Sequence, residues 1–221
     1  MIVEAINDVL PHLGHPDIWP HCVKIMRSQL GQDLFALSET GIKKGGFFVE
    51  FGATNGEDLS NTHMLEKEFG WTGILAEPAK CFQAALRRNR SAKISTDCVW
   101  GQSDMTIPFF EASVPALSTT GANDMHTRKT VDSYSVKTIS LHDLLDKFHA
   151  PREIDYLSVD TEGSEFEILN AFDFSKYAFR VITVEHNFTP SREKVYDLLT
   201  AHGYKRKLEK ITRFDDWYTG N

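Results

Sequence analysis

Four short apolar runs in this chain each carry an acidic residue at or next to their end. The four acids are Glu50, Glu77, Asp160 and Glu185. A carboxylate accepts hydrogen bonds from hydroxyl groups, attracts cations and removes protons. If the runs are neighbouring parallel strands, their ends lie about 5 Å apart at one edge of a sheet. The pattern therefore predicts an acidic site where several strands end.

The first acid stands just before a glycine turn. Residues 47–56 read Phe-Phe-Val-Glu-Phe-Gly-Ala-Thr-Asn-Gly, which is typical of a buried strand that turns sharply toward a helix. Glycine lets the backbone approach a ligand closely. The glycine spacing matches neither the GxGxxG of dinucleotide sites nor the GxxxxGK[ST] of phosphate-binding loops. Because Glu50 precedes the glycines, the turn favours a cationic ligand, and S-adenosylmethionine (SAM) is such a ligand.

The second acid ends another apolar strand, in the segment Thr72-Gly-Ile-Leu-Ala-Glu-Pro78. An acid at the tip of the second strand of a nucleotide-binding unit accepts hydrogen bonds from both ribose hydroxyls. Pro78 then ends the strand and pre-sets the next helix. We therefore predict that Glu77 holds the ribose of the ligand.

The later strands end in further acids and a histidine. Asp160 and Glu162 lie two residues apart, so their side chains point the same way on an extended segment. If the last two apolar strands pair, Asp160 meets Glu185 or His186 at one tip. Such a group removes a proton from a hydroxyl or binds Mg²⁺ or Mn²⁺. We predict that His186 is the base, and that Asp160 and Glu185 orient it or ligate a cation together with it.

The elements that position these residues alternate along the chain, which predicts a mostly parallel sheet with helices on both faces. The predicted strands are 47–51, 73–77, 93–98, 154–159 and 179–185. The predicted helices are 59–68, 79–90, 140–148 and 165–172. A further helix starts at Thr189-Pro190, and residues 204–208 and 212–218 predict a closing antiparallel hairpin. The polar stretch 111–135 predicts a mobile loop over the carboxyl end of the sheet.

Prolines at positions 11, 16 and 20 break the N-terminal region into short helices. The predicted organisation is a helical extension, 1–38, followed by one domain, 39–221. The N-terminal helices are a candidate dimer surface, so a homo-oligomer is one of the assembly states that the sequence allows.

The composition argues against several classes of protein. A net charge of -7 and a pI of about 5.7 disfavour a nucleic-acid partner. Cys22, Cys81 and Cys98 form no CxxC pair, so we expect buried apolar cysteines rather than a zinc site or a disulfide framework. We find no signal-peptide pattern and no apolar run of membrane-spanning length, which predicts a cytoplasmic protein.

Four segments together resemble the FkbM family of SAM-dependent methyltransferases. They are Phe48–Glu57, Ser60–Thr62, Gly70–Pro78 and Asp155–Glu165. Upstream, Ser-Gln-Leu-Gly-Gln-Asp at 28–33 is similar to a segment of one branch of that family. The resemblance implies a Rossmann-like class I methyltransferase fold, whose seven-stranded, mostly parallel sheet has an antiparallel last strand. It also implies O-methylation, often of a sugar or polyketide hydroxyl.

The resemblance assigns roles to individual residues. The residues that it implies for SAM binding are Glu50, Gly52, Ala53, Asn55, Gly56, Ser60, Asn61, Glu77, Pro78, Asp97 and Asp160. Asp160 and Glu162 would lie beside the transferred methyl group. The chain departs from the family at Thr54-Asn55, where Asn-Asp or Asn-x is more usual, but Asn55 and both glycines remain.

The predicted reaction is an in-line displacement in which a hydroxyl attacks the sulfonium methyl group. The acceptor is a small molecule or a glycan: a monosaccharide, a nucleotide sugar, a glycolipid or a polysaccharide end. The aromatic residues that are candidates to stack on a sugar are Trp100, Phe109, Phe110, Trp217 and Tyr218. The basic residues between 205 and 213 are expected to form a solvated hairpin face.

Two other functions stay open. An NAD-dependent oxidoreductase has a similar sheet, but this chain lacks the third glycine of the dinucleotide turn. A non-catalytic SAM-binding module would keep the fold without turnover, although a scaffold has no need to cluster acids at two strand ends.

Overall fold

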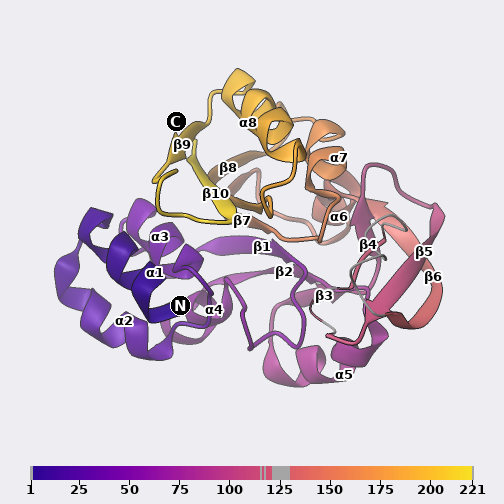
Figure 1. The fold of residues 1–221 in the computed structure, drawn as a ribbon, viewed down its shortest axis with the longest axis horizontal. Helices are drawn as coiled ribbons and strands as arrows, with labels where there is room; N and C mark the ends of the chain where they lie inside the picture. The colour runs from indigo at the N-terminus through magenta and orange to yellow at the C-terminus, as the bar shows by residue number, and fades with distance from the viewer. Residues whose placement is uncertain (1, 115, 117, 121–129, 221) are drawn as a thin grey trace.

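A seven-stranded sheet forms the centre of the computed structural model, which describes residues 2–114, 116, 118–120 and 130–220 (Figure 1). Its strands, in the order β3-β2-β1-β7-β8-β10-β9 across the sheet, are β3 (Lys93–Ser95), β2 (Thr72–Ala76), β1 (Phe47–Phe51), β7 (Glu153–Val159), β8 (Ala178–Glu185), β10 (Asp215–Thr219) and β9 (Lys205–Lys207). The first five are parallel, and β10 runs antiparallel to both of its neighbours. The predicted mostly parallel sheet with an antiparallel last strand is confirmed.

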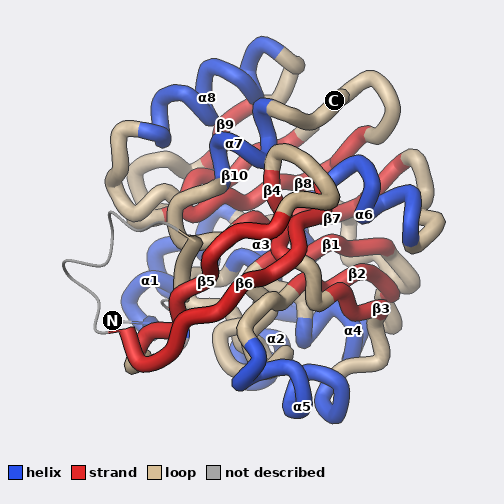
Figure 2. The backbone as a smooth tube through the Cα atoms, turned by 90° about the vertical axis from the view of Figure 1, so that its right-hand side faces the viewer, coloured by secondary structure: helices blue, strands red, loops and turns tan. Residues whose placement is uncertain are grey.

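The central strands β1 and β7 are apolar on both sides because helices cover both faces of the sheet. Val49 pairs with Leu157, and both side chains are fully buried. One face carries α6 (Leu141–Lys147), α7 (Glu165–Asn170) and α8 (Ser191–Ala201), and the other carries α4 (His63–Phe69) and α5 (Lys80–Asn89) (Figures 1 and 2).

The N-terminal segment packs onto the same face as α4. It forms α1 (Ile2–Val9), two short 3₁₀ turns (Leu10–His12 and Pro16–Ile18), α2 (Trp19–Ile25) and α3 (Gln32–Glu39). Phe35 from α3 lies 4.8 Å from Trp217 of β10, measured between ring centroids, and both side chains belong to one buried cluster. The helices before the sheet therefore share a core with it.

A second, three-stranded sheet stands where the sequence predicted a loop. It consists of β4 (Cys98–Trp100), β5 (Thr106–Ala112) and β6 (Thr130–Ser140), with β5 and β6 antiparallel. The prediction of a loop over 111–135 is wrong at its ends, and residues 121–129 lie outside the described part. Apart from Val131, the exposed side chains of β6 are polar, so its composition resembles that of a loop. The predicted strand 93–98 is divided between the two sheets.

Three local predictions can be compared with the structure. The helix predicted from residue 59 starts at His63, because residues 57–62 form a turn around Glu50. The helix predicted over 140–148 forms as α6, and Ser140 caps it by accepting a hydrogen bond from the Asp143 N–H. Cys22 and Cys98 are buried as expected, but Cys81 is exposed on α5. Within the described residues, no helix has the length and apolar character needed to cross a membrane.

Candidate active site

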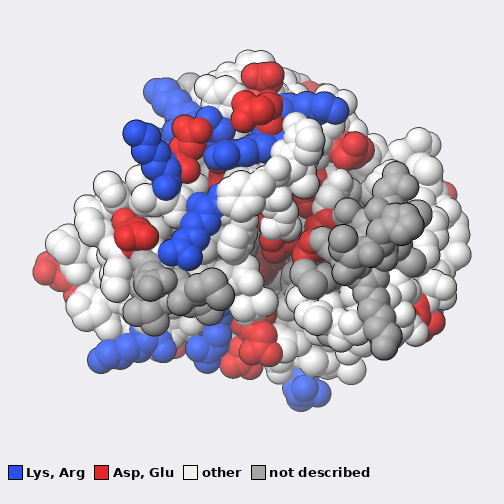
Figure 3. All heavy atoms as spheres, viewed as in Figure 1, with Lys and Arg blue, Asp and Glu red and all other residues white. Residues whose placement is uncertain are grey.

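A cavity of about 280 Å³ opens at the carboxyl ends of β1, β2, β7 and β8. Its lining includes one residue at the end of each of these strands or directly after it: Gly52, Glu77, Asp160 and Glu185. Figure 3 shows acidic side chains gathered in a hollow at the centre of this face. The predicted convergence of acids at one edge of the sheet is therefore present. Such an edge is where open α/β sheets bind their ligands.

Gly52 is required by a close approach between two strands. Its φ is +68°, and a Cβ atom there would lie 2.0 Å from the backbone oxygen of Asp160. Its N–H donates to the Ala76 carbonyl, and Ala53 donates to the same oxygen. The turn is thus held against both neighbouring strands, and the backbone at Gly52 faces the cavity.

Glu50, predicted to bind the cofactor, lies beneath the turn instead of in the cavity lining. Its carboxylate is buried and accepts hydrogen bonds from the Asn61 N–H at 2.7 Å, from Ser60 Oγ at 3.0 Å and from the Thr62 hydroxyl. Asn61 also donates to Ser158 Oγ at 2.9 Å. Glu50, Ser60 and Asn61 therefore shape the turn that lines the cavity.

Arg90 is a component of this turn that the sequence analysis missed. Its fully buried guanidinium donates to the Gly56 carbonyl at 3.0 Å, to Glu66 at 2.9 Å and to the Thr62 hydroxyl at 2.8 Å. A Cβ atom on Gly56 would lie 2.6 Å from the Arg90 side chain. Arg90 follows Arg87-Arg88-Asn89 in a run that reads as an exposed helix end, so no local pattern distinguishes it.

Two other predicted cofactor residues lie away from the cavity lining. Asn55 Oδ1 accepts from the N–H groups of Glu57 and Asp58, both at 2.9 Å, and so stabilises the turn. Asp97 pairs with Lys147 at 2.8 Å and lines a separate hollow. Their predicted contact with SAM stays a prediction.

Glu77 lines the cavity together with Pro78. Its two oxygens accept hydrogen bonds from the backbone N–H groups of Thr54 and Ala79, each at 2.8 Å. Burial raises the pKa of Glu77 to about 7, against the opposing effect of these two donors. Each carboxylate oxygen keeps a lone pair free for a further donor such as a ribose hydroxyl.

The end of the cavity beyond Glu77 is apolar. The side chains that form it come from α5, β4 and β5, and they are Phe82, Cys98, Val99 and Phe109. This apolar end next to the carboxylate of Glu77, which we call the apolar slot, suits a base joined to a ribose. The sequence predicted Cys98 only as a buried apolar residue and assigned Phe82 no part in the site, because the second sheet that brings Phe109 to this end was not expected.

Three acids cluster at the opposite end of the cavity. Carboxylate oxygens of Asp160, Glu162 and Glu185 lie within 4.8 Å of one another. Burial, and then repulsion from neighbouring carboxylates, raises the pKa of Glu185 to about 8 and that of Asp160 well above its usual range. Asp160 and Glu185 hydrogen-bond to each other, so the pair retains a proton near neutral pH.

His186 lies behind this cluster and is absent from the cavity lining. Its Nδ1 accepts a hydrogen bond from the Phe188 N–H at 3.0 Å, and its Nε2 lies 3.8 Å from Asp216 Oδ1. Burial lowers the pKa of the imidazole. The acids that could share a cation with Asp160 in the described part of the chain are therefore Glu162 and Glu185, without His186. Its role as base stays a prediction.

The N-terminal segment also reaches the cavity. Gln29 lines it, and Gln32 anchors the segment by donating to Asp215 Oδ2 at 2.7 Å. Burial raises the pKa of Asp215 to about 7. The segment that resembles one branch of the FkbM family thus contributes directly to the site.

The predicted sugar-stacking aromatics are divided by the fold. Trp217 and Tyr218 are fully buried in the core, so the prediction that they stack on an acceptor is wrong. Phe109 lines the cavity. In the basic segment, Arg206 pairs with Asp216 at 3.3 Å and with Glu209 at 2.7 Å, as expected for a hairpin face.

The sequence model of the methyltransferase FkbM domain matches residues 50–206 of the chain. This range begins at Glu50 and includes Glu77, Asp160 and Glu185. No curated protein matches the chain in sequence.

Three solved structures are similar to the chain. A methyltransferase FkbM from Methylobacillus flagellatus KT has 13% identity and a TM-score of 0.50, covering 98% of this chain and 58% of that chain. A precorrin-6y C5,15-methyltransferase from Geobacter metallireducens GS-15 has 12% identity and a TM-score of 0.48, covering 83% and 76%. A SAM-dependent methyltransferase from Aquifex aeolicus has 10% identity and a TM-score of 0.40, covering 90% and 96%. The similarity to the structure from Methylobacillus flagellatus KT concerns the fold alone.

Proposed function

The chain belongs to the FkbM methyltransferase family, and we propose that this SAM-dependent methyltransferase methylates a hydroxyl group of a sugar. The observation that carries the hydroxyl acceptor is the half-buried Asp160–Glu185 pair in the cavity. The acceptor is a sugar unit, free or at the end of a glycan.

The cavity has a suitable place for the adenine, the ribose and the sulfonium of SAM. The adenine lies in the apolar slot that Phe82 and Phe109 line, and the ribose hydroxyls donate to Glu77. The sulfonium then lies toward Asp160, where the acidic cluster stabilises its positive charge. The backbone at Gly52 passes beside the cofactor without a side chain in the way.

The reaction is a displacement at carbon. The acceptor oxygen attacks the methyl carbon in line with the sulfur, the carbon–sulfur bond breaks, and S-adenosylhomocysteine (SAH) leaves. The hydroxyl proton passes to the ionised member of the Asp160–Glu185 pair. Holding the two reactants in line supplies much of the remaining rate enhancement.

The raised pKa values of the pair favour oxygen over nitrogen as the acceptor atom. A sugar hydroxyl is a weak nucleophile at neutral pH and needs a base, whereas a free amine needs none. A carboxylate with a pKa near that of Glu185, about 8, is a much stronger base than an exposed one. The sequence predicted His186 as the base, with Asp160 and Glu185 orienting it, but the cavity lining supports the Asp160–Glu185 pair in that role.

The test measures SAH release from SAM with a panel of methyl hexosides and short hexose oligosaccharides. We expect Asp160→Asn and Glu185→Gln each to lower kcat at least a hundredfold with SAH affinity little changed. His186→Ala, which leaves the cavity acids in place, should lower kcat far less. Near-normal kcat in both carboxylate variants would refute the proposed base.

The same assay separates the other candidates. Loss of activity with EDTA and its recovery with Mg²⁺ or Mn²⁺ would show that Asp160, Glu162 and Glu185 ligate a cation that activates the hydroxyl. SAH binding without any methyl transfer would favour a non-catalytic SAM-binding module. Binding of NADH in place of SAH would favour the oxidoreductase.

A further inference from the structure

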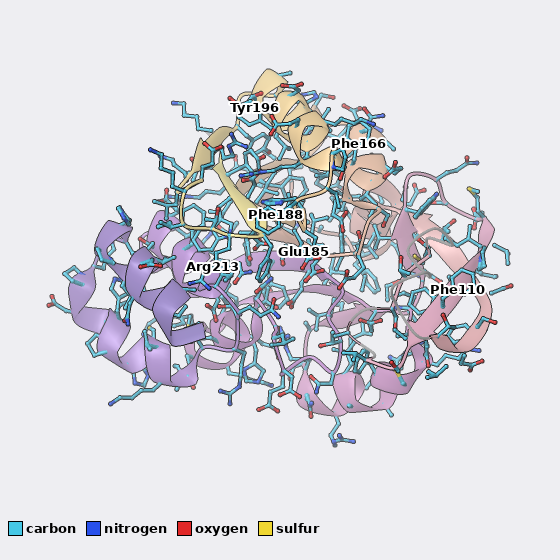
Figure 4. All side chains as sticks on the ribbon, viewed as in Figure 1. Phe110, Phe166, Glu185, Phe188, Tyr196 and Arg213 are labelled. Atoms are coloured by element: carbon cyan, nitrogen blue, oxygen red, sulfur yellow. The ribbon has the colours of Figure 1, made fainter. Side chains whose placement is uncertain are left out.

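Phe188 is a large aromatic side chain that the fold leaves uncovered next to the acidic cluster. It is 71% exposed, the highest value among the large apolar side chains of the described residues. It follows Glu185 by three positions on the loop after β8, and both side chains are labelled in Figure 4. A single exposed apolar residue is ordinary on a protein surface. Phe188, however, lies shortly after a cavity acid, on a loop whose backbone angles are unusual.

Two exposed apolar side chains line the cavity, although Phe188 itself is not part of that lining. Leu59 and Val114 are 42% and 55% exposed, and both line the cavity. Glu185, three positions before Phe188, lines it together with Asp160. A ligand that enters thus meets apolar surface and carboxylates together.

The loop holds Phe188 in a backbone conformation that bulky residues rarely adopt. Asn187 and Phe188 have φ values of +44° and +57°, both in the left-handed region. Such strain persists where the surrounding structure enforces it, and it concentrates at binding sites. Glycine at either position would relieve the backbone strain, but the chain has Asn187 and Phe188 there.

Hydrogen bonds on both sides of Phe188 fix its position. Asn187 Nδ2 donates to Glu185 Oε2 at 2.7 Å, and the Thr189 N–H donates to the His186 carbonyl at 2.8 Å. The Phe188 N–H donates to His186 Nδ1, and the two rings meet edge to face at 5.3 Å between centroids. His186 therefore supports the aromatic ring from behind, and the loop needs no rearrangement to present it.

We propose that Phe188 is a stacking platform for the sugar ring of the acceptor. A pyranose ring presents C–H groups on one face and hydroxyl groups around its edge. Its apolar face lies on the Phe188 ring, and hydroxyls at its edge reach Glu185 and the side-chain amide of Gln29, which also lines the cavity. This inference rests on the proposed sugar acceptor and names the residue that selects it.

The experiment compares steady-state kinetics of the full chain with one methyl hexoside that the wild type methylates. Phe188→Ala should raise KM for the hexoside about tenfold, with kcat within about twofold, because stacking binds the substrate and the transition state alike. Phe188→Trp should restore KM, since the flat ring is what matters. Val131→Ala is the matched control, because Val131 is an apolar side chain that is 62% exposed on β6 of the second sheet, and not on the loop after β8.

Calorimetric titration with SAH accompanies each variant and should give the wild-type Kd throughout. A KM in Phe188→Ala equal to that in Val131→Ala would overturn the platform while leaving the methyltransferase intact. A wild-type protein that binds SAH but methylates no hexoside or oligosaccharide would instead overturn the sugar acceptor, and the platform with it. An equal loss of SAH affinity and hexoside affinity in Phe188→Ala would also overturn the stacking platform, because the Phe188 ring would then affect the whole site and not the acceptor alone.

Discussion

The pKa of Glu77 makes cofactor affinity depend on pH in a way that can be calculated. Its carboxylate is buried, accepts two backbone hydrogen bonds and has a pKa of about 7. Ribose hydroxyls donate hydrogen bonds, so they bind the ionised carboxylate better than the protonated one. Affinity for the cofactor should therefore rise as the pH rises through 7.

The size of the effect follows from the fraction of Glu77 that is ionised. With a pKa of about 7, this fraction is roughly one tenth at pH 6 and roughly nine tenths at pH 8. If only the ionised form binds, Kd falls about tenfold between these values, which is about 1.4 kcal/mol. A protonated form that retains some affinity makes the change smaller, so tenfold is the upper bound.

The assay is calorimetric titration with SAH between pH 6 and pH 8. SAH is preferable to SAM because it lacks the sulfonium charge, whose attraction to Asp160 and Glu185 adds its own pH dependence. Glu77→Gln should bind SAH more weakly and with a nearly constant Kd. A pH dependence that persists unchanged in Glu77→Gln would refute the ribose assignment, as would wild-type affinity in that variant.

Three further predictions concern the residues that build the cavity. Gly52→Ala should lower the free energy of unfolding by about 3 kcal/mol or more and abolish SAH binding, because its Cβ would lie 2.0 Å from a backbone oxygen. Gly45→Ala, with a similar φ of +67° and no atom within 4 Å, should cost only about 1 kcal/mol in denaturant unfolding. Glu185→Gln should stabilise the ligand-free protein by roughly 1–3 kcal/mol at pH 8 in thermal unfolding, with little gain at pH 5. The native state holds the Glu185 proton up to a pKa of about 8 while the unfolded chain releases it near 4.5, so wild-type stability falls as the pH rises between them. Arg90→Met should lower the free energy of unfolding by about 3–5 kcal/mol, since it leaves the buried Glu50 without its cation and Glu66 with Lys67 alone, and wild-type stability would contradict the role given to Arg90.

The acids at the strand ends could be predicted because their placement depends on local pattern alone. A short apolar run ending in an acid gives both the strand and the tip that carries Glu77 or Asp160. Parallel pairing then brings such tips together without further information. The glycine at position 52 is predictable for the same reason, since the turn follows the strand directly.

The residues that were missed or misplaced depend on contacts distant in sequence. Arg90 reaches the glycine turn from the end of α5, and its partners Gly56, Ser60 and Thr62 lie 34, 30 and 28 positions away. The backbone of His186 is held by a hydrogen bond from its N–H to the Phe214 carbonyl at 2.8 Å, just before the antiparallel last strand, and no pattern near His186 reveals that contact. The apolar slot depends on β5 and β6, whose mostly polar exposed side chains concealed the hairpin.

The most direct test of the central claim identifies the atom that receives the methyl group. The protein is incubated with SAM labelled with ¹³C in the transferred methyl group and with the panel of methyl hexosides and oligosaccharides. The products are then examined by carbon–proton correlation NMR. The account predicts a labelled methyl carbon bonded to a sugar oxygen, and its loss in Asp160→Asn. A label bonded to nitrogen or carbon, or undiminished O-methylation in Asp160→Asn, would contradict it.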